Sequence, residues 1–261
     1  MGTRAWFLVA SVLVTLVAEG RLTAQDDVAD IISQDLRAGK DEQKRYFLIE
    51  PPKGVEAPKQ GYGLLVVLPG GDGGADFHAF VKRIYKNAVP PGYVLAQPVA
   101  AKWTEKQGIV WPIDKSRVEG MKFSTEEFVD AVIKDVEGRH KLDSERVFTL
   151  TWSSSGPAAY AASLSSDRIT GSFIAMSVFK PDFLPPLEKA KGQAYFLYHS
   201  RDDRVCPFRM AELAADELKK SGATVKLTTY DGGHGWRGNL YGDIKEGIEW
   251  LEKNHATRAK R

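Results

Sequence analysis

The stretch Arg146-Val-Phe-Thr-Leu-Thr-Trp-Ser-Ser-Ser-Gly-Pro157 decides the fold of this chain. Its apolar first half predicts a short buried strand, and the residues after it lead into an alanine-rich helix near Ala158. A sharp strand-to-helix turn of this kind exposes a serine hydroxyl and directs the next backbone N–H toward developing negative charge. The stretch therefore predicts a nucleophilic serine at the end of a strand.

Three consecutive serines compete for this position, and Ser153 is favoured. Thr151 and Ser155 then occupy the two positions where the strand and helix cross closely. If Ser154 were the nucleophile, the bulky Trp152 would occupy the first of these positions. A helix start capped by serine, without chemistry, is the remaining alternative.

Two further polar sites follow, each in a loop after a predicted strand. In His199-Ser-Arg-Asp-Asp-Arg-Val-Cys-Pro207, the spacing to the later valine and proline favours Asp203 over Asp202, and a turn-forming pair is the alternative. In Tyr230-Asp-Gly-Gly-His-Gly-Trp236, glycines flank His234. The order serine, acid, histidine predicts that Asp203 orients His234, the general base. The other histidines are predicted to be surface or packing residues: His78, His140, His199 and His255.

A glycine-rich segment, Leu68-Pro-Gly-Gly-Asp-Gly-Gly74, follows another predicted buried strand. Glycines let backbone N–H groups approach a ligand closely, as an oxyanion hole requires. Gly71 is the predicted donor, partnered by the N–H of Ser154. The segment lacks the pattern of a dinucleotide fingerprint or a phosphate-binding loop, so no nucleotide cofactor is expected.

Strands and helices alternate along the chain, which predicts a mostly parallel sheet with helices on both faces. A capping box at Ser124 and Glu127 marks the clearest helix, with an apolar stripe at Phe128, Val132, Ile133 and Val136. Strands are expected at 46–49, 64–68, 93–96, 147–150, 173–176, 195–198 and 225–230, and further helices at 27–37, 158–163, 210–220 and 244–251.

Composition is that of an ordinary globular protein, and no linker or internal repeat divides the chain. It has 261 residues, 43% of them hydrophobic, and a formal net charge of +2. Such a small charge argues against electrostatically driven binding of nucleic acid, so no nucleic-acid partner is expected. The lone cysteine, Cys206, has no partner for an intramolecular disulfide and is interpreted as a small buried apolar residue.

Residues 1–24 are predicted to be a signal peptide. A basic start at 1–4 precedes an apolar run over 5–18, which is shorter than the roughly 20 residues of a membrane span. Cleavage after Gly20 or Ala24 leaves a single domain, 25–261, that is periplasmic or extracellular and not inserted in a membrane. A retained N-terminal anchor is the alternative, and lipoprotein processing is excluded because no cysteine lies near the cleavage point.

Together these motifs resemble the α/β-hydrolase superfamily without a large cap, over roughly 46–251. The resemblance is to small secreted serine esterases: the phospholipase/carboxylesterase group, dienelactone hydrolases, and polyhydroxyalkanoate depolymerase-like and feruloyl esterase-like enzymes. In that family G-x-S-x-G forms the nucleophile turn, where this chain has Thr151-Trp-Ser-Ser-Ser155. The resemblance implies hydrolysis of carboxylic esters through a Ser153, His234 and Asp203 triad and an acyl-enzyme, with no metal or cofactor.

The substrate is expected to be a small-molecule or polymer-linked ester. The aromatic segment 92–121 follows a strand whose carboxyl end faces the predicted site, so Trp103 and Trp111 are candidate substrate-binding residues together with Trp152. Packing of a long loop is the alternative, and 179–187 is a candidate partial cap. Two other functions stay open: a serine peptidase or amidase of the same fold, and a binding protein whose turn is weakened by Thr151. The oligomeric state is not predicted.

Overall fold

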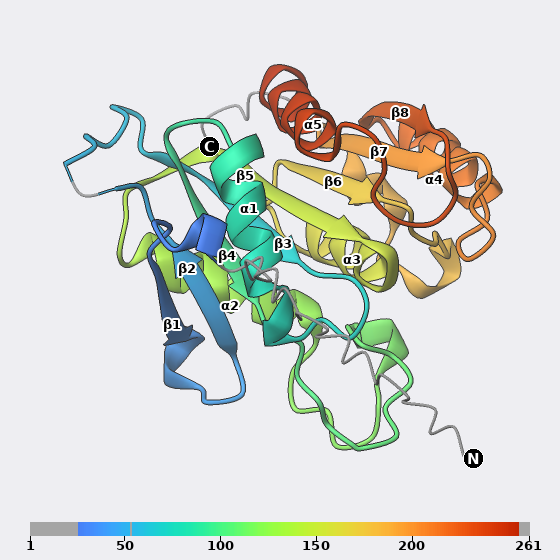
Figure 1. The fold of residues 1–261 in the computed structure, drawn as a ribbon. Coiled ribbons are helices and arrows are strands. Elements are labelled where there is room, and N and C mark those ends of the chain that lie inside the picture. Colours follow the sequence, from blue (N-terminus) through green and yellow to red (C-terminus); the bar gives the residue numbers. More distant parts are fainter. Residues whose placement is uncertain (1–25, 53, 256–261) are drawn as a thin grey trace, which may run out of the picture.

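The computed structural model describes residues 26–52 and 54–255 (Figure 1). The predicted signal peptide, 1–24, lies outside the described residues. Within them, eight strands form one sheet in the order β1-β2-β4-β3-β5-β6-β7-β8. The strands are β1 (Ser33–Arg37), β2 (Arg45–Ile49), β3 (Tyr62–Leu68), β4 (Tyr93–Pro98), β5 (Leu142–Trp152), β6 (Gly171–Ala175), β7 (Ala194–Ser200) and β8 (Thr224–Tyr230).

Parallel pairing dominates the sheet. The first two strands pair antiparallel with each other, and β2 pairs antiparallel with β4, whereas all pairs from β4 to β8 are parallel. Parallel neighbours need crossover connections, which α-helices supply here except between β6 and β7, where two short 3-10 helices lie. The helices are α1 (His78–Ala88), α2 (Thr125–Glu137), α3 (Gly156–Ser165), α4 (Arg209–Lys220) and α5 (Leu240–Asn254).

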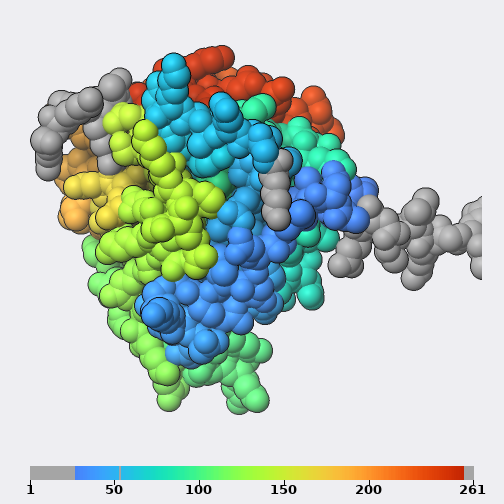
Figure 2. Space-filling model, turned by 90° about the vertical axis from the view of Figure 1, so that its left-hand side faces the viewer, coloured from blue at the N-terminus to red at the C-terminus, as the bar shows by residue number. Residues whose placement is uncertain are grey.

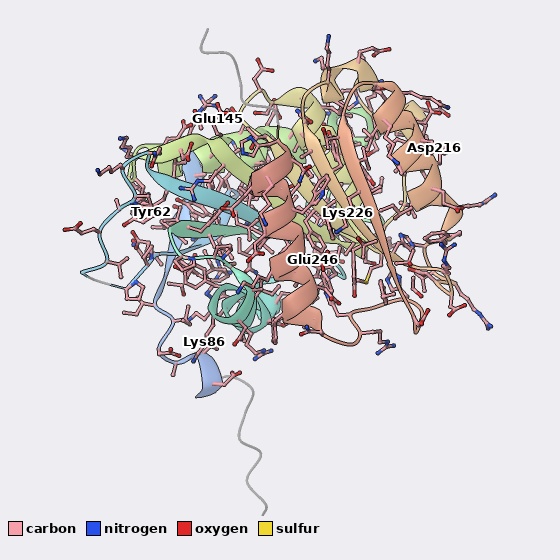
Figure 3. All side chains as sticks on the ribbon, turned by 90° about the horizontal axis from the view of Figure 1, so that it is seen from above. Tyr62, Lys86, Glu145, Asp216, Lys226 and Glu246 are labelled. Atoms are coloured by element: carbon pink, nitrogen blue, oxygen red, sulfur yellow. The ribbon has the colours of Figure 1, made fainter. Side chains whose placement is uncertain are left out.

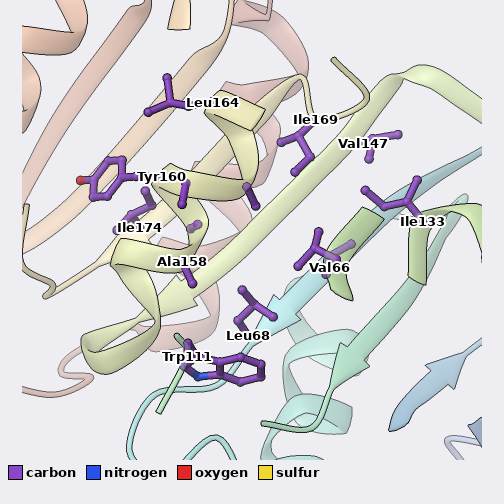
Figure 4. Packing of buried hydrophobic residues seen from close by; sticks show 14 of the residues in the cluster. Val66, Leu68, Trp111, Ile133, Val147, Ala158, Tyr160, Leu164, Ile169 and Ile174 are labelled. Atoms are coloured by element: carbon purple, nitrogen blue, oxygen red, sulfur yellow. The ribbon is translucent and has the colours of Figure 1, made fainter. Parts of the chain in front are cut away.

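Both faces of the sheet are buried, as the alternation along β3 demonstrates. Leu64, Val66 and Leu68 pack with α2, α3 and α4 on one face, and Leu65 and Val67 pack with α1 and α5 on the other. Figure 4 shows part of the first cluster. Successive side chains of a strand point to opposite faces, so a continuous apolar run serves both layers. The predicted fold class, a mostly parallel sheet with helices on both faces, is confirmed.

The start of α2 is also as predicted. The Ser124 hydroxyl accepts the Glu127 N–H at 3.2 Å, and the Glu127 carboxylate accepts the Ser124 N–H at 2.7 Å. All four residues of the predicted apolar stripe are buried. The long loop before this helix extends from the body of the protein (Figure 1).

The helix predicted over 27–37 is wrong. Residues 33–37 form strand β1, which pairs with the edge of β2, and Ile32 is 73% exposed. The unpaired backbone groups of β2 offer a full ladder of hydrogen bonds, which outweighs a weak helical periodicity. Figure 2 shows this edge of the molecule, with the first two strands in blue.

Helix α1 is a second element that was not predicted from the sequence. The buried Val81, Ile84 and Ala88 lie on one face of it, so the signal was present but short. The two unpredicted elements are joined, because the Ser33 hydroxyl of β1 lies 2.8 Å from Nε2 of His78, the first residue of α1.

At the opposite end of the sheet, the last strand is tied to the last helix. In Figure 3, Lys226 of β8 and Glu246 of α5 lie close together, and their Nζ and Oε1 atoms are 2.7 Å apart. Among the described residues, no helix has the length and apolar character that crossing a membrane requires.

Candidate active site

Strand β5 ends in a sharp turn that carries the three serines. Ser153–Ser155 form a single 3-10 turn between the strand and α3. Ser153 has φ +56°, a left-handed conformation that costs energy in a residue with a Cβ. Among the described non-glycine residues, only Lys40, Ser153 and Met176 have a positive φ. The strain falls on Ser153, the serine that the sequence favours as nucleophile.

The close crossing of β5 and α3 is accommodated by residues other than the two glycines of the G-x-S-x-G pattern. Thr151 is fully buried, and its hydroxyl lies 3.4 Å from the Phe173 carbonyl. The Ser155 hydroxyl donates to the Leu68 carbonyl at 2.6 Å and so ties the turn to β3. A Cβ on Gly156 would lie 2.0 Å from Oγ of Ser177, so the position that requires glycine is 156. Thr151 is thus accommodated within the core.

The serine, histidine and acid meet at the carboxyl ends of β5, β8 and β7. Oγ of Ser153 lies 2.9 Å from Nε2 of His234, and Nδ1 of His234 lies 2.8 Å from Oδ2 of Asp203. A carboxylate only accepts, so Nδ1 carries the proton of the neutral ring and Nε2 accepts the serine hydroxyl. This chain of hydrogen bonds places His234 between Ser153 and Asp203, as the predicted roles of the three residues require.

The carboxylate of Asp203 is held on both oxygens. Oδ1 accepts the backbone N–H groups of Val205 and Cys206, each at 2.8 Å, while Oδ2 accepts from His234. Burial alone raises the pKa of this carboxyl, but the hydrogen bonds from His234 and the two amides outweigh burial and lower the pKa below its ordinary value. Asp203 therefore stays ionised and keeps orienting the imidazole.

A second histidine, His199, also faces this carboxylate. Its Nε2 lies 2.7 Å from the Cys206 carbonyl and 3.3 Å from Oδ2 of Asp203, and the residue is 2% exposed. Both neighbours are acceptors, so Nε2 carries a proton. Burial lowers the pKa of His199, which keeps the ring neutral. The sequence prediction left His199 outside the site; its position at the end of a strand, four residues before Asp203, was the available signal.

The glycine segment after β3 lies against the serine turn. The Ser154 hydroxyl donates to the Gly71 carbonyl at 2.8 Å, a contact that sequence analysis did not predict. Gly71 has φ +62°, and a Cβ on Gly70 would lie 2.5 Å from Trp152. The predicted oxyanion donors, Gly71 and Ser154, are thus neighbours in space.

The three candidate substrate-binding tryptophans are packing residues in this structure. Trp111 is 2% exposed, donates its indole N–H to the Pro69 carbonyl at 2.9 Å, and lies among the core side chains of Figure 4. Trp103 packs edge-on against Phe123, beside a cavity of about 10 Å³, which is too small for a substrate. Trp152, 6% exposed, packs edge-on against the aromatic rings of Phe77, Phe80 and Trp236. These contacts favour the loop-packing alternative for Trp103 and Trp111, and Trp152, at the end of β5, is buried among aromatic rings.

The candidate cap, 179–187, is a pair of short turns. Phe179 and Leu184 are buried in the core, and Phe183 is 50% exposed. Residues 181–183 and 187–190 are 3-10 helices. Within the described residues, one group of metal-ligating side chains comes together, and it overlaps the triad: ligand atoms of Asp203, Cys206 and His234 lie within 4.8 Å of one another.

No protein-family model matches this chain, and no curated protein matches it. Solved structures match in fold. A thermostable esterase gives a TM-score of 0.62 at 19% identity, over 87% of this chain and 63% of that one. Esterase 2 of Thermogutta terrifontis, phosphorylated by paraoxon, gives 0.59 at 14% identity, over 84% and 91%. An acylaminoacyl peptidase gives 0.61 at 15% identity, over 88% and 43%.

At these low identities the likeness shows the fold alone, which is that of the α/β hydrolases. The chain spans less than two thirds of the length of the thermostable esterase and of the peptidase. The expected α/β-hydrolase fold without a large cap is therefore confirmed.

Proposed function

We propose that the protein is an exported serine hydrolase that cleaves carboxylic esters. The hydrogen-bond chain from Ser153 through His234 to Asp203, which begins at a serine with φ +56°, is the observation that carries this proposal. Similar turns, strained at the nucleophile, present the reactive serine of α/β hydrolases. The likeness in fold to solved esterases supports the same reaction class.

In the proposed reaction, Oγ of Ser153 attacks the ester carbonyl while Nε2 of His234 takes its proton. The imidazolium is stabilised by Asp203 and then protonates the leaving alcohol. Water, deprotonated by the same imidazole, releases the acyl group from Ser153. The 2.9 Å separation between Oγ of Ser153 and Nε2 of His234 suits these proton transfers, and the 2.8 Å contact between Nδ1 and Asp203 lets the carboxylate stabilise the imidazolium.

The negative charge on the tetrahedral intermediate is proposed to face the N–H groups of Gly71 and Ser154. Their contact through the Ser154 hydroxyl supports this, since it fixes the glycine segment relative to the nucleophile. Substrates are proposed to be small-molecule or polymer-linked esters, with no metal or cofactor taking part and no nucleic acid as partner.

A serine peptidase or amidase is the second candidate function. The likeness in fold to an acylaminoacyl peptidase supports it. A binding protein without catalysis is disfavoured, because the complete hydrogen-bond chain and a buried Thr151 leave the turn intact.

Fluorophosphonate labelling of the purified protein, followed by paired p-nitrophenyl esters and p-nitroanilides of the same acyl groups, tests these functions. We expect labelling and preferential ester hydrolysis. Preference for anilides would favour the amidase over the esterase function. Absence of both labelling and hydrolysis would favour the binding-protein interpretation.

A further inference from the structure

The thiol of Cys206 lies beside the triad but takes no part in the proposed hydrolysis. The residue is 6% exposed, and its backbone N–H already holds Oδ1 of Asp203 at 2.8 Å. Its sulfur, a carboxylate oxygen of Asp203 and a ring nitrogen of His234 lie within 4.8 Å of one another. Sulfur, imidazole nitrogen and carboxylate oxygen are the ligands that Zn²⁺ takes in proteins.

We propose that Asp203, Cys206 and His234 form an inhibitory binding site for Zn²⁺ and related thiophilic divalent cations. The inhibitory effect rests on the proposed hydrolase function, whereas binding itself does not. The fourth position on the metal is left to water, as in three-ligand zinc sites.

Small movements bring the three ligands to zinc geometry. Ligands about 2.0–2.3 Å from a tetrahedral ion lie roughly 3.4–3.6 Å from each other. Nδ1 of His234 and Oδ2 of Asp203, now 2.8 Å apart, must separate slightly, and the sulfur must approach them from at most 4.8 Å. Rotation of the Cys206 side chain and a shift of the imidazole supply these changes while β7 stays in place. Oδ1 keeps its two amide donors, so the carboxylate stays ordered.

Binding removes the general base through the tautomer of His234. The metal takes the lone pair of Nδ1, so the single proton of the neutral imidazole moves to Nε2. Nε2 then donates to Ser153 and no longer accepts its proton. At Cys206 the S–H bond breaks, a sulfur–metal bond forms, and the proton goes to solvent. No oxidation or reduction occurs.

Ligand type sets which cations inhibit. A cation that binds sulfur strongly displaces the thiol proton of Cys206, because a thiol that coordinates a metal is deprotonated. Zn²⁺ and Cd²⁺ do so, whereas Mg²⁺ and Ca²⁺ prefer oxygen ligands. The site therefore selects among divalent cations by their affinity for sulfur, since all four carry the same charge.

Direct binding is measured first, on the Ser153→Ala variant, which retains all three ligands. Titration with Cd²⁺ should produce thiolate-to-metal charge-transfer absorption that saturates at one ion per chain. The Ser153→Ala/Cys206→Val double variant should produce none. Absorption that is absent from the first variant, or equal in both, overturns the site. This readout does not depend on any hydrolytic activity, so it decides the proposal even if the proposed function fails.

Inhibition is measured on the protein with Ser153 intact. Zn²⁺ should inhibit ester hydrolysis reversibly, with EDTA restoring the rate, and Mg²⁺ and Ca²⁺ should have no effect. Cys206→Val keeps the backbone N–H that holds Asp203, and its inhibition is measured against its own metal-free rate. The half-inhibiting Zn²⁺ concentration should rise at least about tenfold, since loss of an outer partner alone costs that much. His140→Gln, which removes a histidine paired with Glu50, is the matched control and should be inhibited like the unaltered protein. Equal inhibition of Cys206→Val and the unaltered protein overturns the proposal.

Discussion

At the scale of single residues, the three serines of the turn perform three different tasks. Ser153 is strained and faces His234, Ser154 is exposed and binds the Gly71 carbonyl, and Ser155 is buried and binds the Leu68 carbonyl. The three roles cannot be read from the residue types, which are identical, because they depend on the backbone conformation at each position.

Ser153→Ala should abolish fluorophosphonate labelling and lower turnover by roughly four to six orders of magnitude, because the members of a triad act as a unit. Ser154→Ala keeps its backbone N–H and loses only the hydrogen bond to Gly71. It should lower kcat about fivefold, the equivalent of roughly 1 kcal/mol. Paired labelling and ester kinetics of the two variants measure the difference. If Ser154→Ala loses labelling and Ser153→Ala retains it, the nucleophile is misassigned by one residue.

His199 is expected to position Asp203 rather than to touch substrate. His199→Leu removes the donor to the Cys206 carbonyl and to Oδ2 of Asp203. We expect kcat to fall roughly five- to tenfold, equivalent to about 1–1.4 kcal/mol, with KM unchanged. His199→Gln, which retains an N–H donor, should restore part of the rate. The positioning role fails if KM rises while kcat is constant, or if the glutamine variant is no better than the leucine variant.

Asp203 makes stability depend on pH with a definite sign. Its pKa is lower in the folded protein than in the unfolded chain, so its ionised form favours folding. This stabilisation is present above the unfolded value of about 3.9 and is lost as the pH falls through the folded value. Urea unfolding of the protein and of Asp203→Asn should therefore differ most near neutral pH and converge in acid. A difference that grows in acid contradicts the lowered pKa.

At the scale of elements, some strands and helices are predictable from their own residues and others depend on contacts with other segments. Buried strands and the capping box of α2 were predictable because each depends on local residues. Strand β1 was not, because its hydrogen bonds are made with another segment, β2, and its own residues carry only a weak helical periodicity. The packing of Trp111 against Pro69 depends on a more distant segment, since the two residues stand 42 positions apart in the sequence.

Gly156 tests the crossing of β5 and α3. In Gly156→Ala, the new Cβ would lie 2.0 Å from Oγ of the buried Ser177, so either the helix or Ser177 must shift. We expect the free energy of unfolding to fall by about 1–3 kcal/mol, as for overpacking elsewhere. Gly138→Ala at the end of α2 is the control: its φ of −70° suits alanine, and its nearest contact is 3.4 Å away.

Urea denaturation of the two glycine variants gives the comparison. Gly138→Ala should leave the protein unchanged or stabilise it by up to about 1 kcal/mol, through a less flexible unfolded chain. Equal stability of both variants would mean that the crossing is not tight at Gly156.

At the scale of the whole molecule, chain order explains why the site was predictable in outline. The three triad residues lie at the carboxyl ends of strands β5, β7 and β8, on one edge of the sheet, and parallel pairing brings such ends together. His199, Cys206 and the Ser154 contact were missed as parts of the site because their roles depend on side-chain directions within loops. The order of strands along the chain therefore predicts where the site lies, whereas side-chain packing decides which residues belong to it.

Export is the last prediction, and it belongs to the whole chain. The basic start and the apolar run over 5–18 are typical of a signal peptide, so the exported protein should begin after Gly20 or Ala24. N-terminal sequencing of protein from the periplasm or medium measures this. Leu13→Arg places a charge in the apolar run and should block export, whereas Thr3→Arg adds the same charge to the basic start and should not. Exported protein that retains Met1 would leave the N-terminal anchor as the better interpretation, and equal export of both variants would contradict a role of the apolar run in export.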